Sequence, residues 1–117
     1  MRDKDLTILM KIIQYADEIS GTISRFELDL DKFKNDYVAK NAIAMCVLQI
    51  GELVNNLSDE FKSEHSKMLW REIVSLRNRA AHAYITIDFE ILWDVATDDV
   101  PEMKTFCERT INEKDNG

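Results

Sequence analysis

Apolar residues recur at three- and four-residue steps along most of this chain, and that spacing predicts amphipathic helices. The first series consists of Leu6, Leu9, Met10, Ile13, Ala16, Ile19 and Ile23. After a short polar connection near Asp29 to Asn35, a second helix is predicted from about Asp36 to Leu57. Its expected buried face consists of Val38, Ala42, Met45, Cys46, Ile50, Leu53 and Leu57. Ser58 marks either the exit of this helix or the cap of a new one.

The helical spacing continues in the second half of the chain. A third helix is predicted from about Lys67 to Ala83, with its core face made by Leu69, Ile73, Leu76 and Ala80. Asp88 can cap the next helix, whose packing residues are Phe89, Leu92, Trp93 and Ala96. Pro101 then either starts a last helix capped by Asp98 or Asp99, or kinks a continuous one.

The composition agrees with a helical protein. Only three Gly and one Pro occur among 117 residues, and the long segments show little of the alternation typical of strands. A hydrophobic content of 45% is enough for one core, so we expect a single domain over residues 1–117. The predicted fold class is all-α, an antiparallel up-and-down helical bundle with additional short helices.

The two cysteines and the N-terminus indicate a cytoplasmic protein. Cys46 and Cys107 lie far apart in sequence, and neither belongs to a cluster with metal-ligand spacing. We therefore expect reduced, structural thiols and no metal or other cofactor. The N-terminal apolar run, residues 6–13, is short and is interrupted by Thr7 and Lys11, so we expect neither a signal peptide nor a membrane span.

Charge is distributed unevenly along a chain whose formal net charge is −7. Between Lys67 and His82 there are four basic residues and one acid, whereas Thr86 to Glu102 contains six acids and no base. An acidic body with one basic element fits a protein that meets a phosphate at a restricted site and keeps its other surface for a protein partner. Ordinary solvated helix faces are the alternative explanation.

The candidate chemistry lies in Arg77-Asn78-Arg79-Ala80-Ala81-His82-Ala83-Tyr84. An Arg side chain offers a fork of donors that matches a phosphate, and His exchanges a proton near neutral pH, so the pair suits phosphodiester cleavage. On a regular helix Arg77 and His82 point about 140° apart. Either the helix loosens near Ala80, or two subunits share one cleft. A helix-terminal pair that offsets the helix dipole is the structural alternative.

The stretch resembles the Arg-x4-His signature of HEPN ribonucleases, and His82-Ala83-Tyr84 extends it to the Arg-x4-His-x-Tyr variant of HepT-like toxins. The likeness covers most of the chain. It also includes Gly51-Glu52, Trp70-Arg71-Glu72-Ile73, Ile87 to Trp93 and Val100 to Lys104, in the order and spacing of that family.

The resemblance implies a homodimeric endoribonuclease toxin that cleaves RNA without a metal, through attack of the ribose 2′-hydroxyl. His82 would be the general acid or base and Arg77 would stabilise charge on the phosphorane, while Asn78 orients the phosphate or His82. The resemblance further implies that a partner nucleotidyltransferase antitoxin adds AMP to Tyr84. That addition would place phosphate where RNA must bind.

Several side chains keep two interpretations. Arg79 contacts substrate or partner, or is a plain surface charge, and Tyr84 closes the core or stands exposed beside the site. Glu52 pairs with a guanidinium of the third helix or faces solvent, and His65 is expected on the surface. The competing hypothesis for the whole chain is a non-catalytic helical subunit that binds a nucleotidyltransferase through the acidic segment 86–102.

Overall fold

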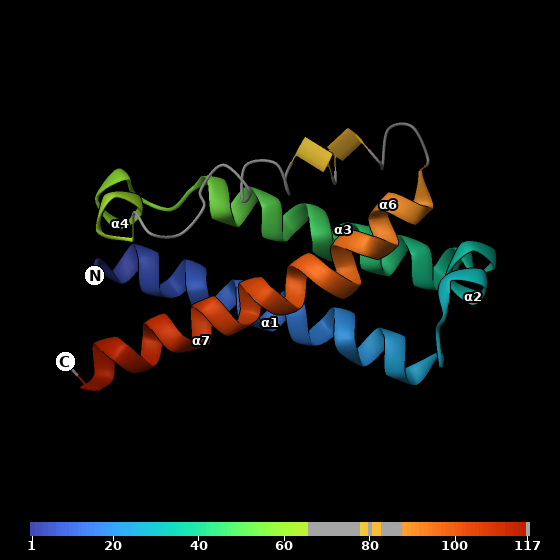
Figure 1. Cartoon of the computed structure of the whole chain (residues 1–117), viewed down its shortest axis with the longest axis horizontal. Helices are drawn as coiled ribbons and strands as arrows, with labels where there is room; N and C mark the ends of the chain where they lie inside the picture. Colours follow the sequence, from blue (N-terminus) through green and yellow to red (C-terminus); the bar gives the residue numbers. More distant parts are fainter. Residues whose placement is uncertain (66–77, 80, 83–87, 117) are drawn as a thin grey trace.

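The computed structural model describes residues 1–65, 78–79, 81–82 and 88–116 of the chain. Its elements are α1 (Asp3–Arg25), α2 (Leu30–Asn35), α3 (Tyr37–Asn55), α4 (Asp59–Glu64), α6 (Phe89–Asp94), the π-helix η1 (Val95–Asp99) and α7 (Val100–Asn116). The helices α1 and α3 run side by side in opposite directions, and α7 packs across α1 (Figure 1). The predicted all-α antiparallel bundle is confirmed, and α2 and α4 are its additional short helices.

The central helix α3 begins where the sequence predicts, but it buries a different face. The Oδ1 atom of Asp36 accepts hydrogen bonds from the backbone N–H groups of Val38 and Ala39, at 3.0 and 3.1 Å, and so caps the helix. The buried residues of α3 are Ala39, Ile43, Ala44, Val47, Ile50, Gly51 and Val54. Three residues of the predicted buried face, Val38, Ala42 and Met45, are instead exposed. The prediction was wrong because α3 is apolar nearly all round, so spacing alone does not select one face.

The expected polar connection near 29–35 is in fact the helix α2. Asp29 caps it by accepting a hydrogen bond from the backbone N–H of Lys32 at 2.9 Å. Phe33 anchors it, since its ring is fully buried and lies 5.1 Å from the ring of Trp93, centroid to centroid. One buried aromatic ring thus gives a six-residue helix a fixed position against α6.

The turn before α2 uses a left-handed residue that is not glycine. Glu27 has φ of 50°, and the N–H of Leu28 donates to the C=O of Ile23 at 2.9 Å. The N–H of Glu27 donates to the C=O of Ser24 at 3.2 Å. This pair of bonds is the Schellman arrangement, which satisfies the last carbonyls of α1.

The core is made by α1, α3 and the C-terminal helical run. Its buried members on that run include Leu92, Val95, Val100, Met103 and Cys107. Burial, and to a smaller extent the nearby Glu108, raises the pKa of the Cys107 thiol to about 12, so it stays protonated and unreactive at neutral pH. Both cysteines are free thiols, as expected.

The helical run from Phe89 to Asn116 is continuous, so Pro101 does not start a separate helix. Asp88 caps the start of the run, since its Oδ1 accepts from the N–H of Ile91 at 3.2 Å, as predicted. Immediately before Pro101 the winding widens to a π-helix, in which the N–H of Val100 donates to the C=O of Val95. Pro101 has no N–H to give, and a local change of winding is a recognised adjustment next to such a residue.

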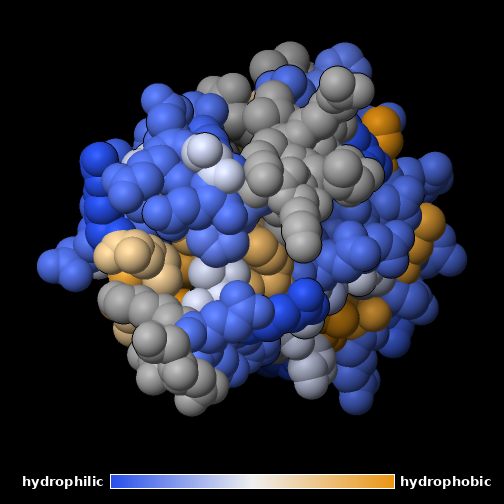
Figure 2. Space-filling view, turned by 60° about the vertical axis from the view of Figure 1, so that its left-hand side comes forward, coloured by the Kyte–Doolittle hydropathy of each residue, from blue (hydrophilic) through white to orange (hydrophobic). Residues whose placement is uncertain are grey.

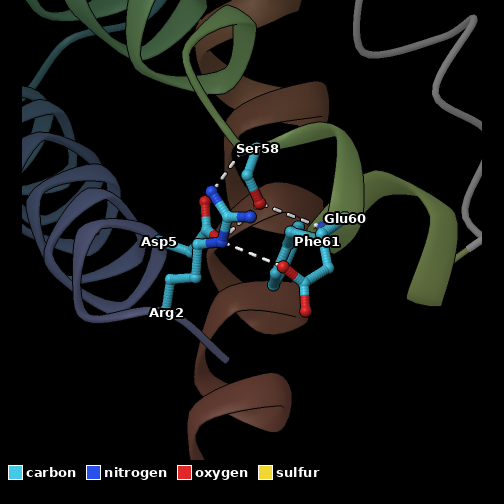
Figure 3. A network of polar contacts seen from close by, with 5 residues as sticks. All are labelled: Arg2, Asp5, Ser58, Glu60 and Phe61. Carbon is cyan, nitrogen blue, oxygen red and sulfur yellow. Dashed lines mark hydrogen bonds and ion pairs between the residues drawn. The ribbon is translucent and has the colours of Figure 1, made fainter.

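The buried carboxylate of Asp5 joins the start of α1 to the corner between α3 and α4 (Figure 3). It accepts hydrogen bonds from the N–H of Ser58 at 2.8 Å and from the Ser58 hydroxyl at 2.6 Å. The Ser58 hydroxyl oxygen accepts in turn from the N–H of Phe61 at 3.0 Å, which caps α4. Next to this network the Nε of Arg2 lies 2.9 Å from a carboxylate oxygen of Glu60, in an exposed ion pair (Figure 3).

The helix α3 is long and apolar enough to cross a membrane, by length and composition alone. The core helix of a soluble protein can have the same length and composition, and α3 packs against α1, α2, α6 and η1. Its apolar character is therefore explained in part by its central position in the bundle.

Replacing Asp5 with Ala should destabilise the fold by about 2 kcal/mol, because the N–H and hydroxyl of Ser58 lose a charged acceptor in a buried place. The matched control is Asp3→Ala, which removes an exposed acid from the same first turn and should cost less than about 1 kcal/mol. Urea unfolding followed by circular dichroism measures both. Equal losses in the two variants would contradict the assigned role of Asp5.

Candidate functional site

The described part of the 77–84 stretch is helical and exposed. Residues 78–79 and 81–82 have helical backbone, and the side chains of Asn78, Arg79 and His82 are all exposed. Arg77 and Tyr84, which the sequence also singles out, lie outside the described residues. Asn78 and His82 are four residues apart, the spacing that places two side chains on one face of a helix. A polynucleotide can therefore reach both groups from solvent.

An ion pair joins this stretch to the helical bundle. The Nη1 atom of Arg79 lies 3.1 Å from Oδ2 of Asp99, which belongs to η1. The side chain of Arg79 keeps 46% of its exposure and that of Asp99 keeps 33%, so the pair is partly shielded from water. Neither interpretation of Arg79, as a contact to substrate or partner or as a plain surface charge, included this partner within the chain, and both stay predictions.

The surroundings of Asp99 are acidic. Burial raises the pKa of the Asp99 carboxyl, the guanidinium of Arg79 lowers it, and the carboxylates of Glu102, Asp98 and Asp94 raise it further. The net direction is upward, so the attraction of Arg79 does not fully compensate for burial and like charge. From the sequence, Asp99 is expected to cap a helix or to belong to the acidic contact segment 86–102, but not to pair with Arg79. The sequence feature that could have indicated the Arg79–Asp99 pair is the opposite charge of segments 67–82 and 86–102.

Glu52 is exposed on α3. Of the three guanidiniums in the predicted third helix, those of Arg71 and Arg77 lie outside the described residues, and that of Arg79 pairs with Asp99. The pairing of Glu52 with a guanidinium of that helix stays a prediction.

His65 is less exposed than the sequence predicts. Its ring stacks on that of Phe61, with centroids 4.2 Å apart, and meets the ring of Phe106 edge-on at 5.9 Å. Its Nδ1 lies 2.9 Å from the C=O of Phe61. His65 is partly buried because it follows the buried Phe61 by one helical turn and shares its face. His65 is thus a packing residue at the end of α4.

The face turned toward the viewer in Figure 2 is mostly hydrophilic, with smaller hydrophobic areas between the polar ones.

Within residues 1–65, 78–79, 81–82 and 88–116, no three His, Cys, Asp or Glu side chains are grouped so that they could hold a metal ion. The chemistry available to the described site is therefore that of an exposed imidazole, an amide and a guanidinium that pairs with a carboxylate.

Comparisons with known proteins agree on one family. The family described as HepT-like, "Ribonuclease HepT-like", matches residues 9–110. The chain is 31% identical to "Probable ribonuclease HepT" of Thermococcus cleftensis over 95 residues, covering 77% of this chain and 86% of that protein. It is 26% identical to "Putative RNase MJ0125" of Methanocaldococcus jannaschii over 105 residues, covering 90% and 89%.

A third relative, "Putative RNase TTE0752" of Caldanaerobacter subterraneus subsp. tengcongensis, is 32% identical over 77 residues, which are 66% of this chain and 69% of that protein. No solved structure matches the chain. The three names refer to ribonuclease activity, and the matched region contains every candidate residue from Glu52 to Asp99.

Proposed function

The chain belongs to the HepT-like ribonuclease family, and from this premise we propose that it is a metal-independent endoribonuclease toxin of the cytoplasm, neutralised by a cognate nucleotidyltransferase. The observation that carries the proposal is the family match over residues 9–110, which places the Arg-x4-His stretch inside the shared region. The exposure of Asn78 and His82 supports it, because RNA must reach both groups.

The proposed cleavage needs proton transfer and neutralisation of phosphate charge. His82 accepts the proton of the ribose 2′-hydroxyl or donates one to the leaving 5′-oxygen, and Arg77 stabilises the charge that develops on the phosphorane oxygens. Asn78 holds a phosphate oxygen or orients His82 by a hydrogen bond. These groups supply both charge and protons, so the reaction requires no bound metal.

Purified protein should cleave a labelled RNA pool in the presence of EDTA, and His82→Ala or Arg77→Ala should slow cleavage by about two to four orders of magnitude. The matched control is His65→Ala, which removes the other histidine of the chain and should leave the catalytic rate unchanged below its unfolding temperature. Cleavage that survives His82→Ala, or that requires a divalent metal, would contradict the mechanism.

A non-catalytic subunit that binds a nucleotidyltransferase is the second candidate. The exposed acids Asp94, Asp98 and Glu102 favour it, since they give the C-terminal run a charged surface on which a basic partner could dock. A folded, unmodified protein that binds its partner but cleaves no RNA would support this candidate over the first.

We further propose that the protein is a homodimer that pairs through the outer face of α3. This face consists of Val38, Ala42, Met45 and Gln49, which recur at the four- and three-residue steps of a helix-pairing seam. Val38 is 52% exposed and Met45 is 57% exposed, and no exposed residue of α3 from Tyr37 to Gln49 is charged. Two copies that each carry −7 can approach through this face without bringing like charges together.

Met45→Asp should shift the protein from dimer toward monomer, because it places like charges opposite each other in the seam. Met10→Asp is the matched control: Met10 is 59% exposed on α1, outside the outer face of α3, and its replacement should leave the dimer intact. Sedimentation velocity over a concentration series measures the shift, expected to be at least about tenfold in the dissociation constant, or 1.4 kcal/mol. A dimer unaffected by Met45→Asp would place the interface elsewhere.

For neutralisation we propose AMP addition to Tyr84, the position that the resemblance to HepT-like toxins indicates. The phenolate oxygen would attack the α-phosphate of ATP and release pyrophosphate. The added phosphate would then compete with RNA for the cationic site two residues away at His82.

Incubation with the partner nucleotidyltransferase, ATP and Mg²⁺ should add AMP-sized increments to the intact mass and abolish RNA cleavage. Tyr84→Phe should prevent both effects, while Tyr37→Phe, which alters a tyrosine that is 74% exposed on α3, should prevent neither. Mass addition that persists in Tyr84→Phe would assign the modification to another residue.

A further inference from the structure

The π-helix η1 determines where the carboxylate of Asp99 lies. Val95, Ala96 and Val100 are buried, and the N–H of Val100 bonds to the C=O of Val95, five residues back. The extra residue of a π turn rotates the preceding helix relative to the following one by about 100°. This winding lets the run stay packed on the core at both ends while Asp99 lies at its edge, against Arg79.

The contact between Arg79 and Asp99 is of a kind that another anion can replace. Among the described residues it consists of one approach of 3.1 Å between Nη1 and Oδ2, although a guanidinium has five N–H donors. A partly exposed ion pair of this kind is weak, and a phosphate that accepts two parallel N–H bonds is a stronger partner for Arg. The side chain of Arg79 is 46% exposed, so such a phosphate can reach it.

The position of Arg79 makes it relevant to RNA. Arg79 precedes His82 by three residues on the exposed stretch, so a strand bound at His82 passes close to it. At the same time, Asp99 and its acidic neighbours Asp94, Asp98 and Glu102 set a negative field against a phosphate at this place.

We propose that Asp99 is an internal competitor for the guanidinium of Arg79, and that an RNA phosphate must displace its carboxylate in order to bind. Asp99 thereby limits the affinity for RNA without taking part in bond cleavage. This inference rests on the proposed ribonuclease function and adds to it a residue that determines substrate affinity.

The test measures binding of a fluorescent single-stranded RNA to the full chain, in a His82→Ala background that prevents cleavage. Asp99→Asn keeps the shape of the side chain and removes its charge, and it should tighten binding by about three- to tenfold. The matched control is Asp98→Asn, which removes one negative charge at the neighbouring exposed position of η1 and should change binding by less than about twofold. If the two variants changed RNA affinity equally, the change would be explained by net charge alone. That result would overturn the proposal.

A double-mutant cycle with Arg79→Ala tests whether Asp99 acts through Arg79. Arg79→Ala should weaken RNA binding and lower the slope of affinity against salt by about 0.7, the loss of one phosphate contact. In that background Asp99→Asn should have no further effect. A tightening that persists without Arg79 would overturn the proposal.

Cleavage kinetics distinguish competition from positioning. With His82 intact, Asp99→Asn should lower KM by the same three- to tenfold range and leave kcat unchanged. A fall in kcat would mean that Asp99 holds Arg79 in a productive place, contrary to the proposal. If every variant binds and cleaves RNA alike, this inference alone fails. If no variant binds RNA at all, the ribonuclease function fails with it.

Discussion

The buried carboxylate of Asp5 is the constraint on which the arrangement of the bundle depends. Within the described residues it is the one charged side chain that is buried, and both its oxygens bond to Ser58. Sliding α1 along α3 by one helical turn, about 5.4 Å, would leave this carboxylate buried without partners, at a cost of several kcal/mol. The Asp5–Ser58 contact therefore selects the register of α1 and α3, and α7 inherits that register because it packs on α1.

Features with local causes could be predicted from the sequence. Asp88 caps α6, and Ser58 caps α4, because a side-chain oxygen reaches a backbone N–H only three residues ahead. The buried face of α3 could not be predicted in the same way. Val38 and Met45 are as apolar as the residues that the core takes, and only the packing of α1 on the opposite side decides which face is covered.

The candidate site also has features that the sequence predicts and one that it does not. The sequence indicates the reactive types at Asn78, Arg79 and His82, and the structure shows each exposed on a helical stretch. The sequence does not indicate Asp99 as a partner of Arg79, because the two are 20 residues apart and Asp99 lies in a π-helix. A π turn has no composition of its own, although Pro101, which has no N–H, follows it directly.

The uneven distribution of charge limits how this protein can bind RNA. A ribonuclease with a broad basic surface binds any RNA, since phosphate contacts supply most non-specific affinity. This chain carries −7, and its C-terminal run sets acids beside the exposed guanidinium of Arg79. RNA phosphates far from the site add little to the binding free energy on such an acidic surface. The affinity for RNA therefore depends on the few contacts made at the candidate site itself. The proposed modification of Tyr84, two residues from His82, would then act directly on those few contacts.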